Sequence, residues 1–239
     1  DSTTGYTLDE VVSTYSQDYY MFEVRPAISY AYPDLGNDGI PEFAVRFTGM
    51  GIYGPGDDST LVYILKEKQG LLELCFYYET WARSDAEMNQ AGYYVSGGSS
   101  SATCYIIESG YVDGEGVYHY ICSSESEYDS ANLSWEPDIG VAAAKLSEKV
   151  GEGEEPFSIL TICFDEIKTE EDYYNAIRYR TFEPTGTERD NVYWEVFAEE
   201  GLTLYDYGEV QQMMKEKEMQ LGVTDEIKAA AALEWIAAE

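Results

Sequence analysis

The sequence predicts an α+β fold, an antiparallel β meander (as a sheet or a partly closed barrel) with flanking N- and C-terminal helices. Two patterns support this prediction. Through the first half of the chain, short segments rich in Tyr, Val, Ile and Phe alternate with Gly/Asp turns, as strands joined by hairpins do. Near the C-terminus, apolar residues recur at helical spacing instead. An apolar fraction of 44% in 239 residues is sufficient for a sizeable core.

The first expected element is a short helix near the N-terminus. Thr7 and Glu10 form a capping-box pattern, and Val11, Val12 and Tyr15 follow on one helical face. A β-rich region is then expected from residue 40 to 125. Its expected strands are 43–47, 60–66, 71–80, 92–95, 102–109 and 117–123.

A mixed α/β region is expected over 126–205 and a helical C-terminus over 206–239. The mixed region contains an expected helix at 139–150, a strand at 157–164, a helix of about ten residues capped by Thr169, and 191–198 as either strand or helix. The C-terminal pattern is Val210, Met213, Met214 and Leu221, a stop at Gly222, and an Ala-rich helix from Thr224 through Leu233 and Trp235. Because no composition break separates these regions, we expect one domain over 1–239.

The charge balance restricts the classes of partner. The chain has 14 Lys+Arg and 46 Asp+Glu, a net charge of −32, which repels nucleic acids and anionic membranes. It has no run of about 18 apolar residues, so no membrane span is expected. A start at Asp1 without Met is typical of a mature or trimmed N-terminus. Membrane association is therefore expected only through a lipid anchor upstream of this chain.

The four cysteines are Cys75, Cys104, Cys122 and Cys163, each in an apolar, strand-like context. There is no C-x-x-C pair and no His at ligand spacing, which argues against a zinc site. Their state stays open between disulfides and buried thiols. If one disulfide forms, we expect it between Cys104 and Cys122, because their strands are expected to be hairpin partners.

The segment Asp34-Leu35-Gly36-Asn37-Asp38-Gly39-Ile40-Pro41-Glu42 has the composition of a loop that wraps a hard cation. Calcium takes six to eight oxygen ligands on a sharply turned backbone. The predicted ligands are Asp34, Asp38, the Ile40 carbonyl and Glu42, and binding is expected to be weak, at the roughly millimolar end of the range for extracellular modules. The alternative is a tight turn that launches a strand, with Gly39 at positive φ and Asp34 capping the turn.

This segment resembles a loop found in exported, mostly uncharacterised lipoproteins and cell-wall-associated proteins of Gram-positive gut bacteria. Their signature is an apolar-aromatic stretch, then Asp-x-Asp-Gly-Asp-Gly-x-Pro-Glu-Leu, then a β meander. Here residues 28–32 precede the loop, and the matches are Asp34, Asp38, Gly39, Pro41 and Glu42. Gly36 departs from the signature, because it stands where the calcium-binding form has a ligand. The resemblance implies export and a β-rich fold, and it implies no activity.

These observations favour a non-enzymatic binding or structural module that is secreted or located at the cell surface. The 23 Tyr and 4 Trp suit a carbohydrate or another envelope protein as partner, and Tyr77, Tyr78 and Trp81 fall near one strand end. The alternative is a carbohydrate- or peptidoglycan-active hydrolase that uses paired carboxylates. Pairs such as Asp165/Glu166 carry little information among 46 acids, so the catalytic residues stay unknown. The single histidine, His119, is expected to be structural.

Overall fold

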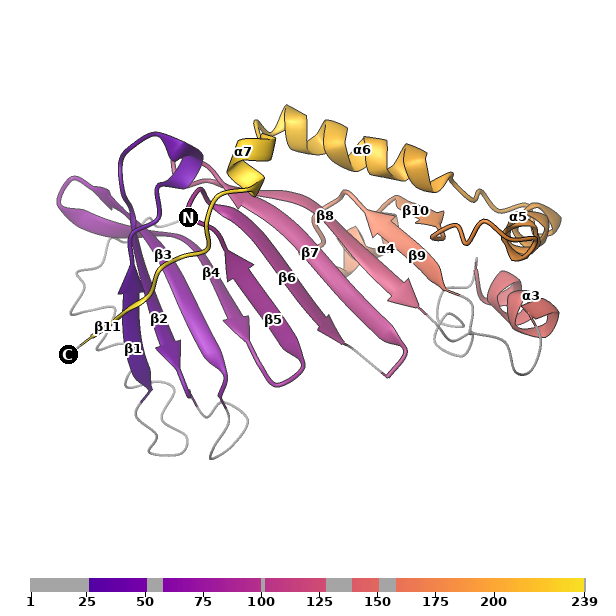
Figure 1. Ribbon diagram of the computed structural model, residues 1–239, viewed down its shortest axis with the longest axis horizontal. Coiled ribbons are helices and arrows are strands. Elements are labelled where there is room, and N and C mark those ends of the chain that lie inside the picture. The colour runs from indigo at the N-terminus through magenta and orange to yellow at the C-terminus, as the bar shows by residue number, and fades with distance from the viewer. Residues whose placement is uncertain (1–25, 51–57, 100–101, 128–138, 151–157, 239) are drawn as a thin grey trace. The chain divides into compact units, whose positions relative to one another are not determined.

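The computed structural model describes residues 26–50, 58–99, 102–127, 139–150 and 158–238 (Figure 1). It contains an antiparallel five-stranded sheet and a six-stranded sheet, accompanied by helices, so the predicted α+β class with a β-rich first half is confirmed. The helix expected at 7–15 lies outside the described residues. Within the described segments, no helix is both long enough and apolar enough to cross a membrane.

The chain divides into two compact units, and each unit is assembled from more than one stretch of sequence. Unit 1 comprises residues 1–96, 109–119 and 222–239, and unit 2 comprises 97–108 and 120–221. The unit boundaries do not coincide with the regions expected from the sequence, because strands β6 (Tyr93–Ser99), β7 (Cys104–Val112) and β8 (Tyr118–Glu127) contribute residues to both units.

The five-stranded sheet lies in unit 1. Its strand order is β11-β1-β2-β3-β4, and the strands are β1 (Ala27–Ala31), β2 (Phe43–Thr48), β3 (Thr60–Lys68), β4 (Leu71–Thr80) and β11 (Ile236–Ala237). Tyr63 on β3 pairs with Val45 on β2 and with Tyr77 on β4. Because successive side chains alternate between faces, this row belongs to one face, where Val45 and Tyr63 are buried. This face of the sheet therefore has an apolar, buried part.

The opposite face of this sheet forms the main core of unit 1. Ala44 and Val62 on β2 and β3 lie in one buried cluster with Met88 of β5 (Ser84–Met88), Tyr94 of β6 and Val112 of β7. Leu35, in the 3-10 helix η1 (Leu35–Asn37), belongs to the same cluster. The acidic loop is thereby anchored to the core by its second residue.

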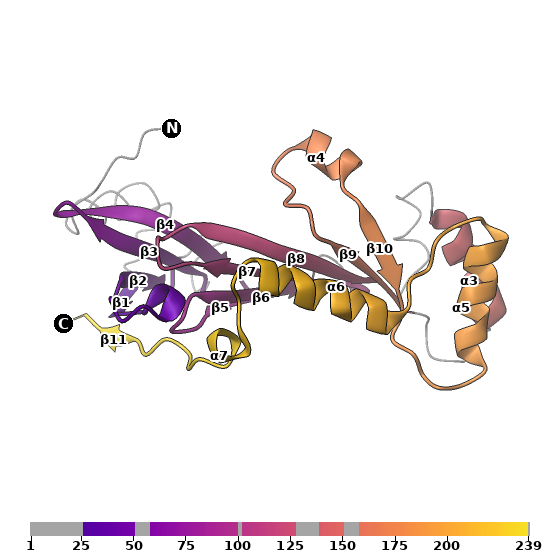
Figure 2. The ribbon, with the colours of Figure 1, turned by 90° about the horizontal axis from the view of Figure 1, so that it is seen from above.

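The six-stranded sheet has the order β10-β9-β8-β7-β6-β5. In unit 2 it includes β9 (Ile159–Cys163) and β10 (Arg178–Thr181), and the helices of this unit are α3 (Gly140–Val150), α4 (Glu170–Asn175), α5 (Arg189–Glu199) and α6 (Tyr207–Gln220). Helices α3 and α5 lie side by side (Figure 2). Their contact contains Ala142, Leu146, Val196 and Phe197, and Ile159 of β9 joins them to form the core of unit 2.

Three expectations about the helices need correction or refinement. The helix capped by Thr169, expected to have about ten residues, has six, because the chain leaves it for strand β10. Residues 191–198, expected as strand or helix, lie within helix α5. The Ala-rich C-terminal helix is wrong: helix α7 covers only Asp225–Lys228, and the chain continues to strand β11. Tertiary hydrogen bonds hold this extended course. The Gln90 N–H donates to the Ala231 carbonyl at 2.7 Å, and the Asn89 amide donates to the Ile227 carbonyl at 2.7 Å.

Candidate functional site

The acidic loop joins β1 to β2, and its two aspartates bind the backbone of the loop itself. Asp34 Oδ1 accepts a hydrogen bond from the Gly39 N–H at 2.8 Å, and Asp38 Oδ1 accepts one from the Ile40 N–H at 2.8 Å. Gly39 has a φ of 84°. The turn features expected from the sequence, an Asp34 cap and a positive φ at Gly39, are therefore confirmed.

Glu42 is the buried residue of the loop, and its carboxylate binds a cation from a neighbouring strand. Its Oε2 accepts from the Leu35 N–H at 2.9 Å, and its Oε1 lies 2.6 Å from Nζ of Lys66 on β3. Lys66 Nζ also donates to the Gly114 carbonyl at 2.5 Å, in the turn between β7 and β8. The hydrogen bond to Glu42 raises the pKa of Lys66 above its usual value, so this ammonium stays charged.

The structure explains why a glycine, Gly36, occupies a position where calcium-binding loops usually have a ligand side chain. Its φ is 72°, and a Cβ added there would lie 2.6 Å from the backbone nitrogen of Gly114. A side chain at this position would collide with the β7–β8 turn, whose backbone is fixed by its own hydrogen bonds. The loop thus lacks a ligand because another turn packs against it.

The four predicted calcium ligands all lie in this loop. One of them, Glu42, already forms an ion pair with Lys66. Asp38 and Ile40 are exposed, Asp34 is half-buried and Glu42 is buried. A calcium ion that used all four residues would have to displace the Lys66 ammonium from Glu42, because both cations seek the same carboxylate. Calcium binding by Asp34, Asp38, Ile40 and Glu42 therefore stays a prediction, and Lys66 is the residue that competes with it.

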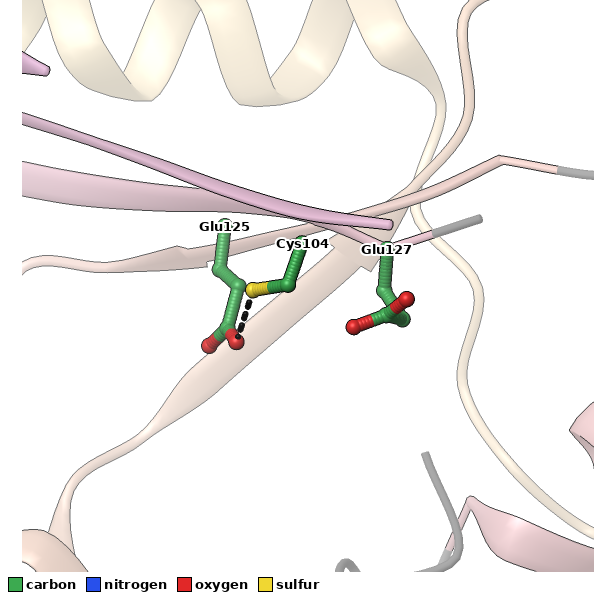
Figure 3. A group of neighbouring side chains, drawn as sticks. All are labelled: Cys104, Glu125 and Glu127. Carbon is green, nitrogen blue, oxygen red and sulfur yellow. Dashed lines mark hydrogen bonds between the residues drawn. The ribbon is translucent and has the colours of Figure 1, made fainter. Parts of the chain in front are cut away.

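Sequence reasoning missed a second group of ligand-type side chains. Within the described ranges, the group of three Cys, His or acidic residues whose ligand atoms all lie within 4.8 Å of one another is Cys104, Glu125 and Glu127. Figure 3 shows the three side chains on the same side of β7 and β8, with Cys104 Sγ directed at Glu125. The Cys104 thiol donates to Glu125 Oε1 at 2.9 Å. These residues come together only because β7 pairs with β8, so no local sequence motif could have identified them.

The four cysteines, all within described segments, are thiols rather than disulfides. Cys104 and Cys122, the pair favoured for a disulfide, are both buried. The thiol of Cys104 instead meets Glu125. Of the two states left open by the sequence, the structure has the buried thiols, with Cys75 only partly buried.

His119 and the acidic pair considered for catalysis, Asp165 and Glu166, have structural partners. His119 Nε2 lies 2.7 Å from Asp113 Oδ2, and Asp113 also accepts the N–H groups of Glu115 and Val117, which closes the β7–β8 turn. Asp165 accepts the Ile177 N–H at 3.1 Å. Its neighbour Glu166 binds Lys168 at 2.7 Å.

A group of exposed apolar side chains lies at the tip of the β9–α4–β10 segment. We call it the α4 tip, defined by Ile167, Tyr173, Tyr174 and Ile177, all of them exposed. None of the six residues of α4 is buried. Figure 2 shows α4 standing clear of α3, α5 and α6. The aromatic face expected from the sequence at Tyr77, Tyr78 and Trp81 is a different surface and is only partly exposed. Tyr78 is buried in the core of unit 1, while Tyr77 and Trp81 are exposed.

The α4 tip is held in place by polar contacts rather than by burial. Thr169 and Asp172 form a capping box, with Thr169 Oγ1 accepting the Asp172 N–H at 3.1 Å and Asp172 Oδ2 accepting the Thr169 N–H at 2.9 Å. Arg178 donates to the Tyr173 carbonyl at 2.8 Å, and its guanidinium lies 4.5 Å from the centre of the Tyr173 ring. The two tyrosines are therefore displayed on an ordered turn.

Comparisons of the chain with models of protein families, with curated proteins and with solved structures found no match.

Proposed function

We propose that this chain is a non-enzymatic binding module that functions outside the cytoplasm, secreted or at the bacterial cell surface, and that the α4 tip is its binding surface. The observation that carries the proposal is a helix with no buried residue that nevertheless presents two ordered tyrosines. Tyr173 is 46% exposed, Tyr174 73% and Ile177 60%. Exposed apolar groups that contribute nothing to a core mark interaction surfaces more often than isolated exposed residues do.

The chemistry of the α4 tip suits a glycan. Tyrosine offers a flat apolar face beside a hydroxyl that forms hydrogen bonds, which matches the apolar faces and hydroxyl edges of sugars. The neighbouring Glu170, Glu171 and Asn175 are exposed and supply acceptors for sugar hydroxyls. A net charge of −32 disfavours polyanionic partners. A neutral polysaccharide of the cell envelope is therefore the partner that we propose, and an envelope protein is the alternative.

The acidic loop supports the non-enzymatic part of the proposal. Its carboxylates bind backbone N–H groups and Lys66, which ties β1, β2, β3 and the β7–β8 turn together. This is a structural use of acidic residues. A weakly bound calcium at Asp34, Asp38, Ile40 and Glu42 belongs to the same proposal, as a ligand that would reinforce the loop.

Sedimentation with insoluble polysaccharides tests the proposal. The full chain is mixed with purified peptidoglycan and with a neutral cell-wall polysaccharide, and the bound fraction is measured over a concentration series. We expect the wild type to bind and Tyr173→Ala/Tyr174→Ala to bind about tenfold more weakly, because two aromatic contacts of roughly 0.5–1.5 kcal/mol are removed. The control is Tyr32→Ala, which removes a tyrosine of unit 1 that is 54% exposed.

Three results would contradict the proposal. The wild type could fail to bind any of the polysaccharides, or the double variant could bind as the wild type does. Release of soluble reducing ends from the same substrates would instead favour the paired-carboxylate hydrolase. Circular dichroism verifies that the double variant remains folded, which we expect because both tyrosines are exposed.

A further inference from the structure

Cys104, Glu125 and Glu127 come from neighbouring strands at one end of the six-stranded sheet. Cys104 is the first residue of β7, and Glu125 and Glu127 lie at the end of β8. Residues i and i+2 of a strand point to the same face, so both carboxylates share one face. The thiol reaches the same place from β7, with Sγ 2.9 Å from Glu125 Oε1 (Figure 3). One sulfur and two carboxylate groups therefore converge on one point.

This convergence is well shielded from water. Cys104 is 5% exposed and Glu127 is 4% exposed, while Glu125 is half-buried. Placing two carboxylates close together in a buried environment is unfavourable unless positive charge compensates them. The strand register provides one such charge. Glu125 pairs with Thr161 on β9, and Thr161 pairs with Arg180 on β10, so Arg180 points to the same face.

The charges on this face fit a divalent cation. The three ligand groups themselves, two carboxylates and one neutral thiol, carry net negative charge. A divalent ion that ionised the Cys104 thiol would add two positive charges and one negative charge, which reduces the net negative charge of the three ligand groups. Binding would release the thiol proton to solvent, since the thiolate is the metal ligand.

The donor set selects the class of metal. Calcium and magnesium are hard ions that take oxygen ligands and do not favour sulfur. Zinc takes thiolate and carboxylate ligands together, usually four in a tetrahedron. Bond lengths of about 2.3 Å to sulfur and about 2.1 Å to oxygen place tetrahedral ligand atoms about 3.4–3.6 Å apart. The ligand atoms here already lie within 4.8 Å of one another, so modest side-chain rotations complete the site.

We propose that Cys104, Glu125 and Glu127 bind a divalent metal ion of the zinc class, with water in the fourth position. The proposal is independent of the glycan-binding function, because the cluster and the α4 tip share no residue. It is also distinct from the calcium prediction for the acidic loop, which offers oxygen ligands alone.

Titration with ZnCl₂ tests the site in the full chain after removal of metals with a chelator. Isothermal titration calorimetry should show one Zn²⁺ bound by the wild type, with excess Ca²⁺ unable to compete. Cys104→Ser should weaken the affinity at least tenfold, and Glu127→Gln should weaken it as well. The matched control is Cys122→Ser, which removes a similarly buried thiol from the opposite face of β8 and should bind Zn²⁺ as the wild type does.

Cobalt provides a second readout that does not depend on affinity. Co²⁺ in place of Zn²⁺ should give a sulfur-to-metal charge-transfer band in the wild type and in Cys122→Ser, and the band should be absent in Cys104→Ser. The proposal is overturned if the wild type binds no Zn²⁺, or if Cys104→Ser retains both the wild-type affinity and the Co²⁺ band. If Glu127→Gln fails to fold, the two cysteine variants still decide the question.

Discussion

The contact between Lys66 and Glu42 leads to a quantitative prediction about the stability of unit 1. The two side chains are 15% and 1% exposed, and their charged atoms lie 2.6 Å apart. Lys66→Met preserves the aliphatic stem and removes the ammonium, which leaves Glu42 buried beside an apolar side chain. Breaking a buried ion pair by removing one partner costs about 3–5 kcal/mol. Because Lys66 is partly exposed, we expect a loss near the lower limit, about 3 kcal/mol.

A second substitution distinguishes two possible causes of the stability lost in Lys66→Met, namely an uncompensated buried charge and lost packing. Glu42→Gln retains an oxygen that accepts the Leu35 N–H and removes the charge. If the cost of Lys66→Met arises from an uncompensated carboxylate, Glu42→Gln/Lys66→Met should be more stable than Lys66→Met alone. Urea unfolding followed by tryptophan fluorescence measures each free energy of unfolding.

Lys68→Met is the matched control for this pair. Lys68 is two residues away on the same strand, and its Nζ lies 2.8 Å from Glu73 in an exposed ion pair. Exposed ion pairs contribute little to stability, so the urea midpoint should not move measurably. The reasoning is refuted if Lys66→Met costs less than about 1 kcal/mol, the range of an exposed pair, or if the double variant is less stable than Lys66→Met.

Three further predictions concern the same region of unit 1. Gly36→Asp, which restores a usual calcium ligand, should destabilise the protein by about 2 kcal/mol or more in urea unfolding without strengthening calcium binding, because the left-handed backbone and the turn at Gly114 exclude a side chain. Burial alone would raise the pKa of Asp113, but the bonds from His119 and two backbone N–H groups lower it overall. Asp113 therefore stabilises the fold above its unfolded pKa and loses that contribution as the pH falls through its folded pKa. Asp113→Asn should lower the urea midpoint at neutral pH, with the difference from wild type vanishing in acid, and a constant difference would contradict this assignment. Millimolar CaCl₂, but not MgCl₂, should raise the melting temperature relative to EDTA, and Asp38→Ala should abolish the rise. Equal melting curves in calcium and EDTA would leave the acidic loop as a turn.

The strands were predictable wherever the sequence alternates between apolar and polar residues or consists of β-branched and aromatic residues. Residues 71–80 were predicted as a strand and form β4, and 60–66 form most of β3, because Gln69 and Gly70 supply the positive φ values of the hairpin turn. The course after Thr224 was predicted wrongly. Alanine favours helix in isolation, but hydrogen bonds from Asn89 and Gln90 hold that segment in an extended course.

The candidate sites divide in the same way. The acidic loop was visible in the sequence, because its carboxylates, glycines and turn lie within nine residues and act on one another locally. The role of Lys66 was not visible, since it is 24 residues from Glu42. The cluster of Cys104, Glu125 and Glu127 depends on the pairing of β7 with β8. The exposure of Tyr174 depends on the tertiary position of α4, which buries none of its residues.

The sequence by itself determined the α+β class, most strand positions, the acidic surface and the turn geometry of the loop, because propensity, alternation and turn chemistry act over a few residues. Only the tertiary structure decided that Lys66 binds Glu42 and that no side chain fits at position 36. It alone also placed the Cys104 thiol beside two carboxylates. Each of these depends on strand register and on the approach of distant turns. A one-residue change in register would move every side chain of a strand to its other face.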